Sequence, residues 1–131
     1  MAINDFKIRD NFNLKEFQSP DTGEVKIDSR LLDKLQQLRE KIGKPVIVTS
    51  GYRTPAHNKR VGGHPNSYHM QGLAADIVVA GMTSREIATV AREVGFTGIG
   101  VYPTRGHCHV DVRPGPAVFF NGEKPGESPG L

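Results

Sequence analysis

The chain has 131 residues, a formal net charge of +3 from 17 Lys and Arg against 14 Asp and Glu, and one cysteine. This length predicts a single domain, the scattered basic residues argue against a nucleic-acid partner, and one cysteine excludes an internal disulfide framework and a Cys-rich zinc finger. The longest apolar run, residues 77–80, is too short for membrane insertion, and residues 1–5 lack the basic and apolar regions of a secretory signal peptide. We therefore expect a protein that is cytoplasmic when made.

The first part of the chain holds one clear helix. Residues 1–28 follow no regular pattern, apart from a short helical turn expected at residues 11–17. A helix is predicted from a cap at Asp28 or Ser29 to a stop at Gly43, because four apolar residues recur on one helical face: Leu31, Leu35, Leu38 and Ile42.

The middle of the chain alternates between strands and helices. A capping box at Thr83–Glu86 opens a second long helix that ends at Gly95, because each side chain can bond the other's backbone N–H. Apolar and β-branched runs predict four strands and one short helix: strands over 45–50, 73–79, 98–102 and 107–112, and the helix over 55–61.

Two long helices among short strands favour an α+β fold with a small, mainly antiparallel sheet flanked by helices. We place a single domain over residues 1–113. Residues 114–131 are rich in Pro and Gly, so we expect a C-terminal tail that is partly docked and partly disordered.

Two local patterns carry titratable side chains. His69 ends a loop, and Asp76 interrupts the apolar run of the strand that follows. A carboxylate in a half-buried strand is costly unless it is paired or binds a metal, so the alternative is a buried Asp satisfied by amides or an arginine. In the second pattern strand alternation puts four polar residues on one face, with Cys108 facing the core: His107, His109, Asp111 and Arg113. The alternative there is a polar face turned to solvent.

Together the patterns offer two imidazoles and one carboxylate, the usual three protein ligands of a catalytic zinc with a metal-bound water as nucleophile. The remaining histidine of the His107 and His109 pair is then a general base. Arg53, just after the strand-ending Gly51, is a candidate anion clamp, although most arginines in such places are surface residues.

The segments S-G-Y-R-T, S-Y-H-M-Q-G-L-A-A-D-I and H-C-H-V-D-V, within residues 10–113, resemble the zinc D,D-peptidases. The resemblance is greatest to the branch of D-alanyl-D-alanine carboxypeptidases and phage endolysins, and it implies the small sheet-and-helix fold shared with Hedgehog domains. It assigns residues by role as follows: zinc ligands His69, Asp76 and His109; substrate and oxyanion binding Arg53; further substrate contacts Ser67 and Tyr52; and base His107. Asp111 is a competing base, favoured here as a partner that orients His109. Gly106 stands where the dipeptidase branch has a catalytic glutamate.

The resemblance implies zinc-dependent hydrolysis of a peptide bond in peptidoglycan stem peptides, either as a carboxypeptidase or as an endopeptidase. The alternative is a non-catalytic, metal-containing module that binds cell wall or belongs to a phage virion. We expect a monomer that reaches the wall through a phage holin or another export route. Which bond is cut, and in which type of wall, stays open.

Overall fold

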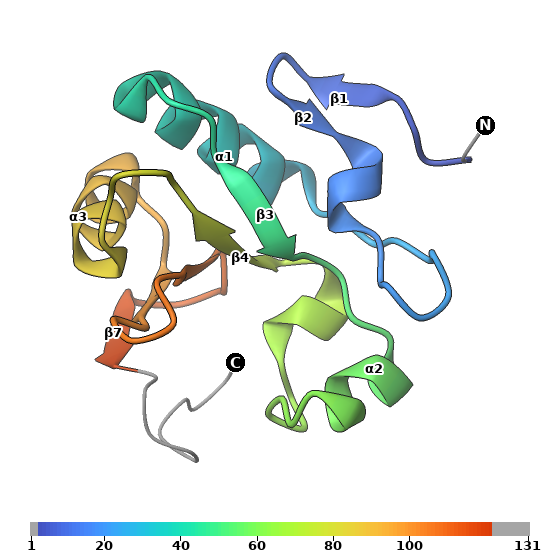
Figure 1. Ribbon diagram of the computed structural model, residues 1–131. Coiled ribbons are helices and arrows are strands. Elements are labelled where there is room, and N and C mark those ends of the chain that lie inside the picture. Colours follow the sequence, from blue (N-terminus) through green and yellow to red (C-terminus); the bar gives the residue numbers. More distant parts are fainter. Residues whose placement is uncertain (1–2, 122–131) are drawn as a thin grey trace.

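The computed structural model describes residues 3–121 of the chain (Figure 1). Along the sequence, the elements are β1 (Lys7–Arg9), β2 (Phe12–Asn13), the 3-10 helix η1 (Leu14–Phe17), α1 (Ser29–Ile42), β3 (Ile47–Ser50), α2 (Pro55–Arg60), the 3-10 helix η2 (Tyr68–Gln71), β4 (Ala74–Val78), α3 (Ser84–Val94), β5 (Gly98–Val101), β6 (Cys108–Asp111) and β7 (Val118–Asn121).

Residues 3–121 form two sheets, and together with the helices they confirm the α+β fold. The larger has five strands in the order β3-β4-β6-β5-β7, and the smaller is the β1–β2 pair. All pairings in the larger sheet are antiparallel except that of β5 with β7, which is parallel. The larger sheet is therefore antiparallel except at the edge strand β7, in agreement with the predicted mainly antiparallel sheet.

The two long helices begin and end where the sequence predicts. Asp28 accepts a hydrogen bond from the Arg30 N–H at 2.8 Å and caps α1, which stops at Gly43 with φ at 73°. The Thr83–Glu86 capping box of α3 is formed on both sides. A backbone position with positive φ favours glycine, which explains why α1 ends at Gly43.

The core lies between the sheet and the two long helices, which Figure 1 shows on one side of the sheet, with α2 and η2 beyond the other. Fully buried side chains come from both layers, among them Leu31, Leu35, Ile77, Ile87 and Val110. Each such side chain contributes roughly 1.5–3 kcal/mol on burial. Cys108 is also buried in this core, as the alternation of its strand predicts.

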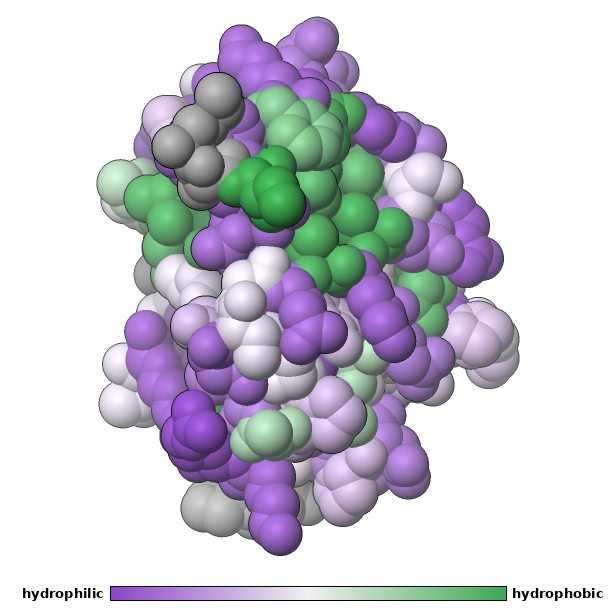
Figure 2. All heavy atoms as spheres, turned by 90° about the vertical axis from the view of Figure 1, so that its right-hand side faces the viewer, coloured by the Kyte–Doolittle hydropathy of each residue, from purple (hydrophilic) through white to green (hydrophobic). Residues whose placement is uncertain are grey.

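The structure differs from the sequence expectations near the N-terminus of the chain. The N-terminal segment, expected to be irregular around a helical turn, contains β1 and β2 before the turn η1. Figure 2 shows apolar side chains gathered over this N-terminal part, where Ile3 is 90% and Phe6 51% exposed.

At the other end, residues 118–121 of the expected tail form the parallel edge strand β7, while residues 122–131 lie outside the described part. No helix within residues 3–121 has the length and hydropathy needed to cross a membrane.

Candidate metal centre

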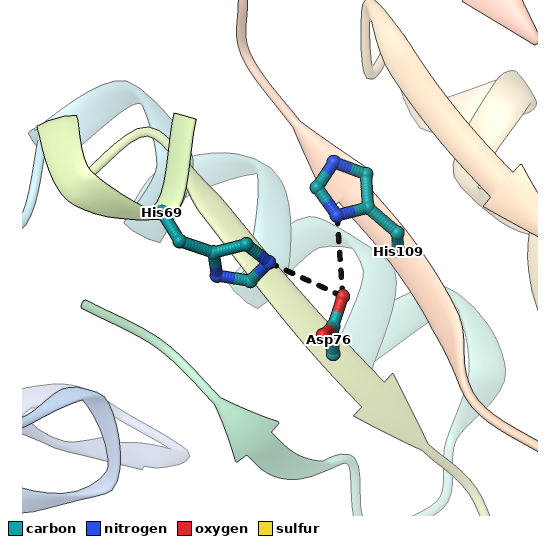
Figure 3. Close-up of side chains that lie close together, drawn as sticks. All are labelled: His69, Asp76 and His109. Atoms are coloured by element: carbon teal, nitrogen blue, oxygen red, sulfur yellow. Dashed lines mark hydrogen bonds and ion pairs between the residues drawn. The ribbon is translucent and has the colours of Figure 1, made fainter. Parts of the chain in front are cut away.

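Three side chains from separate elements meet on the side of the sheet away from the long helices. Asp76 of β4 lies directly opposite His109 of β6, and His69 reaches the same point from η2 (Figure 3). The Asp76 Oδ1 atom is 3.4 Å from His69 Nε2 and 3.2 Å from His109 Nδ1. One donor atom from each residue lies within 4.8 Å of the other two, and all three residues are buried.

Both imidazoles are oriented by a partner on their far nitrogen. His69 Nδ1 lies 2.8 Å from the Gly51 carbonyl oxygen, and His109 Nε2 lies 2.7 Å from Asp111 Oδ2. Carbonyl and carboxylate oxygens only accept, so these two nitrogens carry the protons. The opposite ring nitrogens, His69 Nε2 and His109 Nδ1, thereby both face Asp76.

Two imidazole nitrogens and one carboxylate oxygen, each imidazole fixed by an outer hydrogen bond, are a donor set that zinc accepts. Three protein ligands leave a coordination position for water or substrate. Among residues 3–121 this is the cluster of histidine, cysteine and acidic side chains with suitable spacing for a metal ion. The residues present therefore fit the zinc that the sequence implies.

Charges around the cluster favour an ionised Asp76 and a neutral His69. Burial opposes the charge of Asp76, but the two histidines and their hydrogen bonds hold its pKa well below the usual value. Burial is also the main cause that lowers the pKa of His69. Burial opposes the charge of His109, but its bonds to Asp111 and Asp76 outweigh that effect and raise its pKa. Metal binding would therefore release a proton from this imidazole, because a ligating histidine must be neutral.

Arg53 lies beside the cluster, on the segment that follows β3. Its Nη2 atom is 3.3 Å from Asp76 Oδ2, and its Nε donates to Ser50 Oγ at 3.1 Å. A third contact, from Nη1 to Asn58 Oδ1 at 3.3 Å, completes a fixed orientation of the guanidinium. The structure thus brings a positive, planar donor group next to the carboxylate of the metal cluster.

His107 comes just before β6 and is only partly buried, outside the three-residue cluster. Its ring stacks on Tyr102, with centroids 4.2 Å apart and planes 20° from parallel. The hydroxyl of Ser84 ties the two backbones together, since it donates to the His107 carbonyl at 2.6 Å and accepts from the Tyr102 N–H at 2.9 Å. The candidate base is therefore fixed at the start of β6, the strand that also carries His109.

Ser67 and Tyr52 are both buried, at 0% and 5% exposure. The Ser67 hydroxyl accepts from the His69 N–H at 3.2 Å and caps η2, while the Tyr52 N–H donates to the Phe17 carbonyl at 2.7 Å. In this structure both residues support the segments around the site. Their contacts with substrate stay predictions.

Three residues that sequence reasoning did not assign to the site complete its walls. Gly98 and Gly100 of β5 lie opposite Asp111 and His109 of β6, so β5 itself places no side chain against either partner. A Cβ at Gly98 would lie closer than 3.0 Å to the whole Asp111 carboxylate, and one at Gly100 would overlap the Phe120 ring. The Phe120 ring itself packs against His109, with the two ring centroids 5.7 Å apart. Alternating glycines within a predicted strand are the signal that points to such a close approach.

Comparison with known proteins agrees with this geometry. The profile of the peptidase M15 family matches residues 7–111. The chain belongs to the peptidase M15 family. It is 41% identical over 81 residues to the zinc D-Ala-D-Ala carboxypeptidase of Streptomyces albus G, covering 59% of this chain and 32% of that protein. It is 34% identical over 95 residues to the peptidoglycan L,D-endopeptidase MepK of Escherichia coli strain K12, covering 67% of this chain and 52% of that protein.

The chain thus spans between about a third and about a half of the length of these relatives. The family assignment confirms the resemblance to zinc D,D-peptidases that the motifs indicate.

Proposed function

We propose that this member of the M15 family hydrolyses a peptide bond in bacterial peptidoglycan with zinc held by His69, Asp76 and His109. The observation that carries the proposal is the convergence of two imidazole nitrogens and one carboxylate oxygen within 4.8 Å. Zinc bound there supplies a Lewis acid for the scissile carbonyl and lowers the pKa of a bound water to about 7.

His107 is the proposed base. Burial lowers its pKa from the usual value, so the imidazole is neutral at pH 7 and accepts a proton from the attacking water. Its partial exposure leaves the ring accessible to that water, and the stack on Tyr102 limits its rotation. The same imidazolium then donates the proton to the leaving amine. Proton uptake and release by one ring balance the hydrolysis.

Arg53 has the proposed role of stabilising negative charge on the substrate. Its guanidinium is fixed by Ser50 and Asn58, so it needs no reordering when charge develops on the scissile carbonyl oxygen. The same group suits the free carboxylate of a terminal D-alanine. Arg53 is therefore compatible with a carboxypeptidase and with an endopeptidase, and the named activities of the two relatives include both.

The finer proposal is a phage endolysin that is made in the cytoplasm and reaches the wall through a holin. It is supported by the motif resemblance to the endolysin branch. Expression in a bacterial host with and without a holin tests it, because an endolysin lyses the culture only when the holin is present. Lysis without a holin, or none with it, contradicts this finer assignment.

The general proposal is tested by the amino groups released from purified peptidoglycan. Zinc-loaded protein is expected to release them, whereas chelated protein and the Asp76→Ala variant are not. Arg85→Ala, an exposed arginine of α3 remote from the ligands, is the matched control and keeps wild-type release. Equal release before and after zinc removal overturns the proposal, and no release by zinc-loaded protein on several wall types favours a binding module.

A further inference from the structure

The predicted ligand His109 is backed by a hydrogen-bonded chain of buried side chains. Its Nε2 donates to Asp111 Oδ2 at 2.7 Å, and Asp111 is 0% exposed. Arg113, 7% exposed, then surrounds this carboxylate: Nη2 donates to Oδ2 at 2.7 Å, Nε to Oδ1 at 2.9 Å, and the backbone N–H to Oδ1 at 3.0 Å. Both oxygens of Asp111 are thus held by one arginine.

The other side of the same guanidinium contacts the segment that carries the first ligand. The Arg113 guanidinium carbon lies 4.7 Å from the centroid of the Tyr68 ring. Tyr68 opens η2 and immediately precedes His69. Arg113 therefore touches both segments that supply imidazoles, although its own side chain takes no part in the ligand cluster.

This arrangement determines which nitrogen of His109 is available to a metal. Because Arg113 bonds both oxygens of the Asp111 carboxylate, that group cannot rotate. It therefore offers a fixed acceptor to His109 Nε2 and keeps a proton on that nitrogen. Nδ1 then faces Asp76 Oδ1 at 3.2 Å, on the side of the ring where a metal ion would bind. If the carboxylate were free to turn, the imidazole would lose both its anchored tautomer and its orientation.

We propose that Arg113 is a positioning residue of the zinc site, which acts by locking Asp111 and by packing on Tyr68. This inference rests on the proposed zinc-binding role of His69, Asp76 and His109. A purely structural alternative is that Arg113 only neutralises a buried carboxylate. The two readings differ in what a lysine at this position does, because lysine keeps the charge and lacks the rigid two-pronged donor geometry.

The experiment compares Arg113→Lys and Arg113→Met with wild type. Zinc affinity is measured by competition with a chromogenic chelator, and the tautomer of His109 by nitrogen-15 NMR of the protein at saturating zinc. Loss of an outer partner of a ligating histidine typically weakens metal binding about 10- to 100-fold. We expect a loss in that range for both variants, with a mixed His109 tautomer, even where circular dichroism shows a folded protein.

Arg92→Met is the matched control. Arg92 also lies 4.7 Å over an aromatic ring, that of Phe119, but it is exposed and outside the site. It is expected to leave zinc affinity and the His109 tautomer unchanged.

Arg113→Met leaves a buried carboxylate without its partner and can fail to fold. Arg113→Lys then decides the matter, since it retains the charge. A folded Arg113→Lys protein with zinc affinity within about twofold of wild type and an unchanged tautomer overturns the inference, and points to charge neutralisation alone. Neither readout uses substrate, so the failure of peptidoglycan hydrolysis in the wild type would be recognised separately.

Discussion

Gly98→Ala is the substitution that most directly tests how the sheet makes room for the site. Gly98 lies opposite Asp111 in the β5–β6 pair, and its φ is not in the left-handed region. Alanine at such a position ordinarily stabilises a protein by about 0.4–1 kcal/mol, because the unfolded chain loses conformational freedom. The structure predicts the opposite sign here.

The added Cβ would lie under 3.0 Å from the Asp111 carboxylate, which is fully buried and held by two partners. Restoring an ordinary contact requires a shift of roughly 1 Å, enough to break the bond with His109. Overpacking costs about 1–3 kcal/mol and one lost charge-assisted hydrogen bond about 1.5–3 kcal/mol. Together these give a loss of about 2.5–6 kcal/mol, or roughly 10–24 °C in melting temperature for a domain of this size.

The assay is thermal unfolding of the zinc-free protein followed by circular dichroism. Gly115→Ala is the control, because its φ is 96° with nothing within 4 Å of the new Cβ, so only backbone strain of about 1–2 kcal/mol is expected. In an Asp111→Ala background the clash partner is gone, and Gly98→Ala is expected to be neutral or stabilising. An unchanged or raised melting temperature for Gly98→Ala in the wild-type background would refute this reasoning.

Three further predictions concern the ligands, acid stability and the cysteine. His109→Ala loses zinc, measured by elemental analysis after gel filtration, while His107→Ala keeps zinc and loses most turnover; two active, zinc-replete variants would exclude these roles. Burial opposes the charge of Asp111, but its bonds to His109 and Arg113 outweigh that effect and lower its pKa to about 2. The ionised Asp111 carboxylate therefore stabilises the folded state fully above the unfolded pKa of 3.8, and this stabilisation is lost as the pH falls toward 2. In urea unfolding, the wild type is therefore expected to lose about 2 kcal/mol more unfolding free energy than Asp111→Asn between neutral and acid pH. An equal loss in both proteins would contradict the role of the ionised Asp111. Burial raises the pKa of the Cys108 thiol, so an alkylating reagent is expected to label it only after denaturation, and rapid labelling of the native protein would show that it is accessible.

The helices could be predicted closely because their signals are local. Caps such as Asp28 and Thr83 and stops such as Gly43 lie within a few residues of the elements that they bound. The strands β1 and β2 escaped prediction, since segments of three and two residues have no measurable alternation. The strand β7 was also missed, because its four residues lie within a Pro- and Gly-rich segment that is typical of a tail.

The ligand cluster was accessible to sequence reasoning for a related reason. His69 and Asp76 are close in the chain, and strand alternation places His109 on the polar face of its strand. The choice of nitrogen on each imidazole was not accessible, because it depends on Gly51 and Asp111 as partners in the folded state. The space at Gly98 depends likewise on cross-strand register, which no local pattern encodes.

The most direct test of the central claim is mass spectrometry of muropeptides after incubation with zinc-loaded protein and, in parallel, with chelated protein. The account predicts a zinc-dependent change that corresponds to hydrolysis of one kind of peptide bond. Loss of a single alanine identifies a carboxypeptidase, and scission within the stem or cross-link identifies an endopeptidase. Muropeptides that are unchanged across walls of several chemical types, with zinc bound at the His69, Asp76 and His109 cluster, would contradict a catalytic role for this site.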